Sequence, residues 1–167
     1  MLPDHLRAGL DVVFCGTAVG RMSAARGHYY ANPGNLFWKM LAETGLTPHR
    51  LRPEEDHRMP DLGLGLTDLA KGVAGQDADI PRAAFDPDRV FATVAALRPR
   101  ALAFTSLTAA RIACGAQAVA GPLPPDPRAP GVMLWALPSP SGLARRHFDR
   151  GPWQALADWR GARAWAA

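Results

Sequence analysis

Cysteine is scarce in this sequence, with only Cys15 and Cys114 among 167 residues. Both thiols lie in apolar surroundings, which predicts that they are buried and reduced. Two cysteines cannot hold an iron–sulfur cluster, and no two Cys or His residues have the spacing of zinc ligands. We therefore expect no metal site and no cofactor.

Long apolar runs are also missing, and no stretch approaches the roughly 20 residues of a membrane span. The first residues, Met1 to Asp4, lack the architecture of a signal peptide. A hydrophobic content of 48% and a charged content of 20% are ordinary for a soluble globular protein. The length fits one domain over residues 1–167. We therefore expect a monomeric, single-domain, cytoplasmic protein that does not bind membranes.

Lysine is nearly absent as well, because apart from Lys39 and Lys71 the positive charge behind the net +4 is arginine. The forked guanidinium of arginine suits phosphate oxygens. An acidic spot lies at Glu54 to Asp56, whereas the C-terminal quarter is crowded with arginines, namely Arg145, Arg146, Arg150, Arg160 and Arg163. A one-sided basic surface indicates phosphate contact. An arginine-rich composition inherited from a high-GC genome is the alternative explanation.

Four apolar segments are predicted to be strands: Asp11 to Cys15, Leu62 to Leu69, Ala101 to Thr105 and Val132 to Leu137. Helices are predicted over Asn35 to Thr44, over Pro87 to Leu97, from Ser106 or Thr108 to Gly115, and over Pro152 to Trp165. The stretch Thr47 to Pro60 is predicted to be a solvated surface connection with one helical turn, and Lys71 to Ala84 and Gly121 to Pro130 are predicted to be loops. Strands that alternate with helices predict an α/β fold, a three-layer sandwich with a mainly parallel four-stranded central sheet.

The first predicted strand ends at a turn that begins with Gly16 and ends with Gly20. Such a turn lets backbone N–H groups approach a planar or anionic ligand without a Cβ in the way. Two tyrosines, Tyr29 and Tyr30, follow, and then the run Asn32-Pro33-Gly34-Asn35-Leu36-Phe37-Trp38. This combination indicates a flat pocket with an aromatic wall and an amide at its rim. In parallel sheets such pockets lie outside the carboxyl ends of the strands.

These residues resemble the first motif of the mismatch-specific uracil/thymine-DNA glycosylases, a branch of the uracil-DNA glycosylase superfamily. The likeness rests on Gly16-x-x-x-Gly20, on Tyr30 and on Pro33-x-Asn35-x-Phe37-Trp38. The family's second motif, Pro-Ser-Gly-Leu-x-Arg, is similar to the stretch from Pro138 to Arg145. The resemblance covers nearly the whole chain. It implies an enzyme that flips uracil out of duplex DNA, with single-stranded DNA as a further candidate partner, and hydrolyses the N-glycosidic bond to leave an abasic site.

The resemblance also implies roles for individual residues. Gly16, Thr17 and Ala18 would bind the base, and Tyr30 would stack on it, with Tyr29 turned toward the core. Ser106 and His28 are further candidates for contact with the base. The second motif would supply the DNA wedge and phosphate contacts from Ser139, Ser141, Gly142, Leu143, Arg145 and Arg146, with Leu143 as the apolar wedge.

The sequence departs from the family at the residue that holds the attacking water. The family carries an asparagine in the middle of the glycine turn, where this chain has Ala18. Asn35 is the first candidate to replace it, because an asparagine in a similar Tyr-Tyr-x-x-Pro-x-Asn context serves catalysis in the hypoxanthine-acting branch; a helix N-cap is its alternative role. Asp68, just past the second strand, and Asp77, in a loop that could swing over the pocket, are the other candidates. No lysine lies in either motif, so water is the expected nucleophile of a monofunctional enzyme.

Three other functions stay open on the sequence. The run from Tyr29 to Pro33 is compatible with a glycosylase for a deaminated purine such as hypoxanthine. Ala18 makes a non-catalytic binder of damaged bases conceivable. A small nucleotide-binding protein is a third reading, although the chain has neither a Walker lysine nor a GxGxxG motif.

Overall fold

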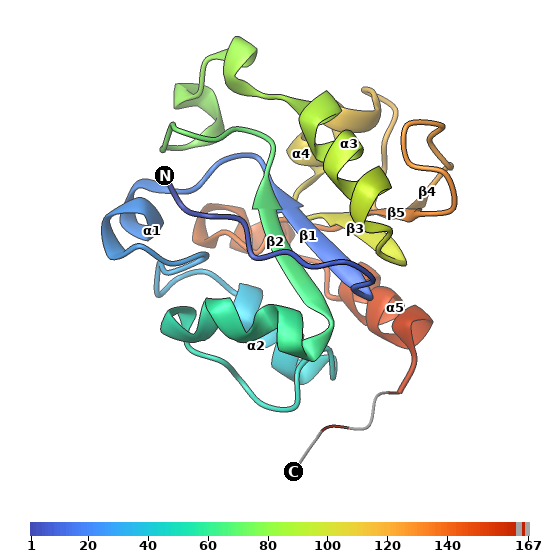
Figure 1. Ribbon diagram of the computed structural model, residues 1–167. Helices are drawn as coiled ribbons and strands as arrows, with labels where there is room; N and C mark the ends of the chain where they lie inside the picture. The colour runs from blue at the N-terminus through green and yellow to red at the C-terminus, as the bar shows by residue number, and fades with distance from the viewer. Residues whose placement is uncertain (163–164, 166–167) are drawn as a thin grey trace.

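The computed structural model describes residues 1–162 and 165, and its centre is one five-stranded sheet with the strand order β2-β1-β3-β5-β4. The strands are β1 (Val12–Gly16), β2 (Leu64–Asp68), β3 (Ala101–Phe104), β4 (Gly121–Leu123) and β5 (Met133–Ala136). The first three and β5 are parallel to one another, and β4 joins β5 antiparallel at the edge (Figure 1). The predicted α/β class and mainly parallel sheet are confirmed, and the predicted strand number of four is corrected to five.

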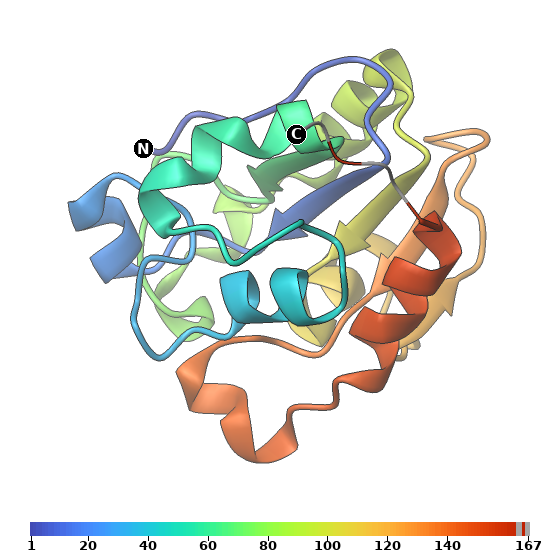
Figure 2. The ribbon, with the colours of Figure 1, turned by 90° about the horizontal axis from the view of Figure 1, so that it is seen from below.

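Helices cover both faces of the sheet. These are α1 (Arg21–Arg26), α2 (Phe37–Glu43), α3 (Pro87–Leu97), α4 (Leu107–Cys114) and α5 (Gly151–Arg160). Figures 1 and 2 show α3 and α4 on one side of the sheet and α2 and α5 on the other. Each side has its own core of buried apolar side chains, as the two buried clusters show. Both faces of β1 are therefore covered, which is why its sequence is a continuous apolar run and does not alternate.

Short 3-10 helices complete the chain: η1 (Pro53–Leu62), η2 (Asp77–Asp79), η3 (Arg82–Ala84) and η4 (Gly142–His147). The surface connection predicted over Thr47 to Pro60, with one helical turn, therefore contains more helix than expected, because η1 covers its second half. Pro53 at the start of η1 and three acids in its first turn favour a helical start, while Asp56 and Met59 are buried. The predicted loop over Lys71 to Ala84 likewise contains two single turns, η2 and η3.

The stretch predicted as a proline loop, Gly121 to Pro130, begins with the strand β4. A proline is tolerated here because an edge strand does not need every backbone N–H for pairing. The helix α1 was not predicted, since its six residues bury only Ser23 and show no apolar periodicity. The predicted last helix ends earlier than expected, at Arg160, where Gly161 follows as its C-cap.

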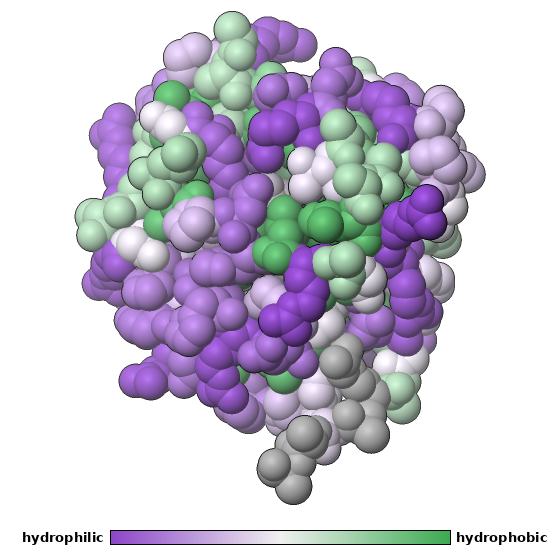
Figure 3. Space-filling view, viewed as in Figure 1, coloured by the Kyte–Doolittle hydropathy of each residue, from purple (hydrophilic) through white to green (hydrophobic). Residues whose placement is uncertain are grey.

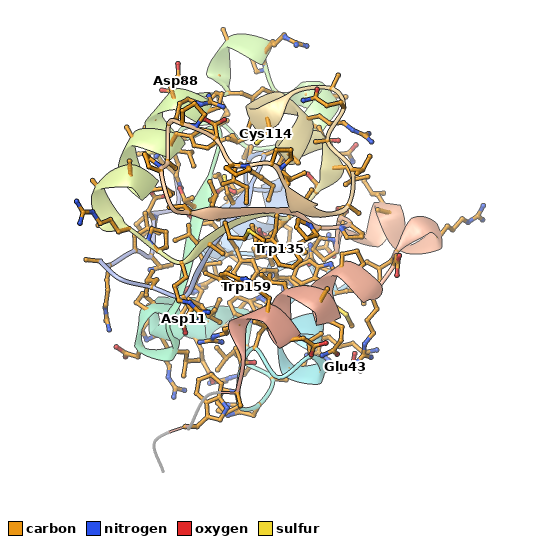
Figure 4. The ribbon with its side chains drawn as sticks, turned by 90° about the vertical axis from the view of Figure 1, so that its right-hand side faces the viewer. Asp11, Glu43, Asp88, Cys114, Trp135 and Trp159 are labelled. Atoms are coloured by element: carbon orange, nitrogen blue, oxygen red, sulfur yellow. The ribbon has the colours of Figure 1, made fainter. Side chains whose placement is uncertain are left out.

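Two of the five C-terminal arginines predicted to form a basic surface, Arg150 and Arg160, are engaged in contacts within the protein. Arg160 is only 7% exposed, and its Nε donates to Asp11 Oδ2 at 3.0 Å. Its other nitrogens donate to the backbone oxygens of Leu46 and Leu62. Arg150 Nη1 lies 3.4 Å from Glu43 Oε2, so its charge is partly offset; Figure 4 shows Asp11 and Glu43 near α5. Arg160 is therefore a structural cation, and Arg163 lies outside the described residues.

Two smaller predictions also have an outcome in the fold. Cys15 is buried, as predicted, whereas Cys114 is only partly buried at the end of α4; both are free thiols. Burial raises the pKa of both thiols above their ordinary value, to about 11 for Cys114. Among the described residues, no helix is long and apolar enough to cross a membrane.

Candidate active site

A cavity of about 860 Å³ opens at the carboxyl ends of the parallel strands. The turn Thr17 to Gly20 after β1, Asp68 at the end of β2, and Thr105 and Ser106 after β3 line it. The segment 138–144 after β5 lines it as well. The two turns that the sequence singled out, more than 100 residues apart, therefore share one cavity, at the place where parallel sheets bind ligands.

The cavity floor is a set of polar groups gathered around Gly16. A Cβ at this position would lie 2.8 Å from Asp68 Oδ1, and 3.4 Å from both Thr105 Oγ1 and the Tyr30 hydroxyl. Asp68 reaches this point because the β1–β2 register places it directly beside Gly16. Only glycine leaves room for three polar side chains to converge at the end of β1.

Asp68 is the carboxylate at this floor, and it is only 2% exposed. Within the described part of the chain, its Oδ2 has no hydrogen-bond partner. Lys71 Nζ is 3.7 Å from that oxygen, which is an ion pair but too long for a hydrogen bond. Burial raises the pKa of Asp68 to about 6, against the opposing effect of Lys71. This carboxyl group therefore changes its charge within the pH range in which enzymes work.

Lys71 is fixed by contacts on the side away from Asp68. Its Nζ lies 2.6 Å from Asp4 Oδ1 and donates to the Tyr29 hydroxyl at 2.8 Å and to the Leu2 carbonyl at 3.2 Å. The N-terminal segment thus packs behind the site and holds the ammonium in place. Because Asp4 competes for the same ammonium, Lys71 lowers the pKa of Asp68 only in part.

The aromatic wall consists mainly of Tyr30. Its ring stacks on Phe37 with centroids 3.9 Å apart and an interplanar angle of 18°, and its hydroxyl is 2.9 Å from Thr105 Oγ1. The backbone of Tyr30 has φ +50°, a conformation that is strained for a residue with a side chain. Tyr29 also contributes to the cavity lining but is 2% exposed and belongs to the core. Both tyrosines thus line the cavity, and Tyr29 is the more deeply buried of the two.

The two motif segments touch each other directly at the rim. Leu36 N donates to the Pro140 carbonyl at 2.8 Å, and a Cβ at Gly142 would lie 3.2 Å from the Gly34 oxygen. Leu143 follows on this rim with 79% of its surface exposed. Ser141 Oγ accepts from Leu143 N at 3.3 Å, and Ser139 Oγ accepts from Ser141 N at 3.2 Å. The serines thus brace the turn that presents an exposed leucine.

The other candidates for water positioning carry structural contacts. Asn35 lines the cavity, and its Oδ1 accepts from Phe37 N at 2.9 Å, so it also caps the start of α2. Asp77 Oδ1 accepts from Thr17 Oγ1 at 2.5 Å, which fixes η2 against the glycine turn. Ser106 lines the cavity, but its Oγ accepts from Ala109 N as the N-cap of α4. Ala18 also lines the cavity and adds no polar atom from its side chain.

Two of the predicted residues with described side chains, His28 and Arg146, are not in the cavity lining. His28 Nδ1 lies 3.3 Å from the buried Asp56, so its ring belongs to the contact between η1 and the segment that carries Tyr30. Arg146 is exposed on η4 beyond the rim. The backbone of Arg145 is part of η4, but its side chain lies outside the described residues.

Thr105 and Lys71 are the residues of this site that the sequence did not reveal. Thr105 ends the third predicted strand, and a polar residue at that position is a local signal, although the sequence analysis favours the neighbouring Ser106. Lys71 gave little local signal, because apart from its ion pair with Asp68 its contacts come from residues more than 40 positions away. Among the residues that the structure describes, no three His, Cys, Asp or Glu side chains gather as metal ligands would.

Comparison with known proteins agrees with this geometry. The solution NMR structure of a candidate uracil DNA glycosylase from Methanosarcina acetivorans is similar with a TM-score of 0.70 over 96% of this chain and 97% of that chain. The two sequences are 20% identical, so this likeness shows the fold alone. The family model of the uracil DNA glycosylase superfamily matches residues 3–163, which is nearly the whole chain. This chain therefore belongs to the uracil DNA glycosylase superfamily.

Proposed function

We propose that this protein is a monofunctional DNA glycosylase that flips uracil out of DNA and hydrolyses its N-glycosidic bond with water. The observation that carries the proposal is the buried carboxylate of Asp68 at the floor of the cavity shared by both motif segments. Superfamily membership supports glycosylase chemistry, and the cavity supplies a place for an extruded base.

Extrusion of the base requires something to fill the space left in the stack. Leu143 is suited to this role, because it is an exposed apolar side chain on a braced turn at the cavity rim. Unstacking costs a few kcal/mol per base step, which contacts with the opened DNA must offset. Gly142 lets this turn pack closely on Gly34, so that the wedge and the pocket keep a fixed spacing.

The extruded base would stack on Tyr30. One face of this ring is already covered by Phe37, so the base would occupy the other face, and such stacking is worth about 1–3 kcal/mol. Backbone N–H groups of the turn from Thr17 to Gly20 would donate to the carbonyl oxygens of the base. Fixed donors at these oxygens stabilise the negative charge that develops as the base departs.

Asp68 is the residue that we assign to the attacking water. Its ionised carboxylate accepts a proton from water while the water oxygen bonds to C1′, and the electron pair of the C1′–N1 bond leaves with the base. A base with a pKa of about 6 is largely ionised at neutral pH and still accepts protons well. Asn35 would orient the water or the sugar through its amide nitrogen, since its oxygen is engaged by Phe37 N. Asp77 is the weakest of the three, because it is tied to Thr17.

A deaminated purine such as hypoxanthine is the second candidate substrate. The cavity volume of about 860 Å³ gives room for a bicyclic base as well as a pyrimidine. Backbone donors that bind a uracil carbonyl would equally bind the single carbonyl of hypoxanthine.

One experiment tests both candidates. Labelled single- and double-stranded oligonucleotides with U opposite G, U opposite A, hypoxanthine or T are incubated with the wild-type protein and with Asp68→Asn, Asn35→Ala and the control Asp88→Asn. We expect abasic sites from uracil with the wild type and Asp88→Asn, a loss larger for Asp68→Asn than for Asn35→Ala, and no cleavage of T. Cleavage of hypoxanthine alone would move the assignment to the second candidate. Tight binding of damaged DNA without any cleavage would identify a sensor and refute the proposed chemistry.

A further inference from the structure

A second cavity of about 310 Å³ lies beside the first one. It is formed by the end of α1, the start of α2 and the segment 50–54 that enters η1, and Figure 2 shows these segments on one side of the molecule. The two cavities share Tyr30, Asn32 and Asn35 in their lining. These three residues form the boundary between the two cavities. A DNA strand would cross this boundary if one of its bases entered the first cavity.

The two cavities differ in charge. The lining of the first contains Asp68, Asp77 and Asp79 together with Arg21. The lining of the second contains one acid, Glu54, and three arginines, which are Arg26, Arg50 and Arg52. Phosphate oxygens are therefore repelled from the base cavity and attracted to its neighbour. Figure 3 shows hydrophilic side chains over η1, at its lower left.

The three arginines do not have equal contacts. Arg26 Nη1 donates to the Ala31 carbonyl at 3.0 Å, and Arg52 Nε lies 3.2 Å from Glu55 Oε1. Arg50 is exposed, and none of the ion pairs formed among the described residues involves it. Asn32 Oδ1 accepts from Gly34 N, which leaves its amide nitrogen as a donor at the boundary of the two cavities. The second cavity thus combines a guanidinium with an amide donor, a pair that suits phosphate.

We propose that this second cavity binds the phosphodiester adjoining the extruded nucleotide, with Arg50 as the principal contact and Asn32 as a donor to the same phosphate. The inference rests on the proposed function, because it places the base of that nucleotide in the first cavity. It also assigns phosphate contact to a surface that the sequence did not indicate. The C-terminal arginines that the sequence favoured are partly used elsewhere, since Arg160 is buried and Arg150 contacts Glu43.

The test measures binding and needs no excision. Affinities are measured for an oligonucleotide with a tetrahydrofuran abasic analogue, in which single phosphates near the analogue are replaced in turn by neutral methylphosphonate. For the wild type, we expect neutralisation of one phosphate next to the analogue to weaken binding about 3- to 10-fold. Arg50→Gln should weaken binding by a similar factor, lower the slope of log affinity against log salt by about one, and be insensitive to methylphosphonate at that position.

The matched control is Arg7→Gln. Arg7 is an exposed arginine that lines neither cavity and pairs with Asp61 at 2.9 Å, so its loss should leave the affinity and the salt slope unchanged. An Arg50→Gln protein that keeps the wild-type response to every methylphosphonate would overturn the inference. The inference would also be overturned if Arg50→Gln lost affinity for free dUMP or inorganic phosphate but kept the wild-type affinity for the oligonucleotide. The second cavity would then bind free phosphates and not a phosphodiester of DNA. Absence of excision alone would instead count against the proposed function.

Discussion

Replacing Asp68 by Asn is expected to make the folded protein more stable at alkaline pH while it abolishes excision. Burial raises the pKa of Asp68 from its ordinary 3.8 to about 6, so the folded state holds this proton more tightly than the unfolded state does. The unfolded state therefore binds fewer protons between these two pH values, and the free energy of unfolding falls as the pH rises through them. Above pH 6 the carboxylate is ionised in the folded state as well, and the full free-energy cost of burying its charge lowers the stability.

The size of that cost follows from the shift. About two pKa units correspond to about 3 kcal/mol, since each unit is worth 1.36 kcal/mol. Asparagine has a similar shape and no charge, so Asp68→Asn should recover up to about 3 kcal/mol at pH 8 and nothing near pH 4. Lys71 is not left without a partner in the variant, because Asp4 lies 2.6 Å from its Nζ and the Tyr29 hydroxyl accepts at 2.8 Å.

Urea unfolding at pH 8, 6.5 and 5 measures this gain, with Asp88→Asn as the control on an exposed carboxylate. The excision rate of the same Asp68→Asn protein should fall about 10²- to 10⁴-fold, the range typical of a lost general base. A variant that is less stable than the wild type by the same amount at every pH would refute this reasoning. In that case the carboxylate would be a structural partner of Lys71 and would not be a strained catalytic group.

The remaining predictions concern the same cavity. Gly16→Ala should lower excision strongly and stability by about 1–3 kcal/mol, because its Cβ would lie 2.8 Å from Asp68 Oδ1. Gly20→Ala, whose Cβ would meet nothing within 4 Å, should leave stability unchanged, and chemical denaturation compares the two variants. The value of kcat/KM should fall about tenfold per unit below pH 6, as Asp68 is protonated, and a flat acidic limb would contradict this. Leu143→Ala should slow excision from duplex more than from single-stranded DNA, and equal losses would argue against a wedge.

The fold could be predicted from the sequence wherever a signal was local. β1 and β3 are continuous apolar runs because both faces are covered, and the Asp86 side chain caps α3 by accepting from Arg89 N. The strand β4 was missed because its three residues include a proline, and only pairing with β5 makes it a strand. Helix α1 was missed for a similar reason, since its placement depends on the turn that precedes it and on Ser23 bonding Ala31 N.

In the site, too, features with a local sequence signal could be predicted and features set by long-range packing could not. The two glycine-containing turns could be located from sequence because turn chemistry is local, and the parallel fold then places them at one end of the sheet. The burial of Asp68 beside Gly16 and the contact of Asn35 with Phe37 N could not be predicted, because register and packing decide them. The β1–β2 register sets Asp68 beside Gly16, and a shift of one residue would point the carboxylate to the other face of the sheet.

This register also gives a physical reason why Ala18 is compatible with catalysis. The resemblance implies an asparagine inside the glycine turn, where this chain has Ala18, whereas Asp68 reaches the cavity from the neighbouring strand β2, beside Gly16. A Cβ at residue 16 would lie only 2.8 Å from Asp68 Oδ1, so this placement of the carboxylate needs glycine there. The position of Asp68 at the end of β2 also buries its carboxylate, and burial raises the pKa of that group into the range of a useful general base. The β1–β2 register and the burial of Asp68 are therefore parts of one arrangement.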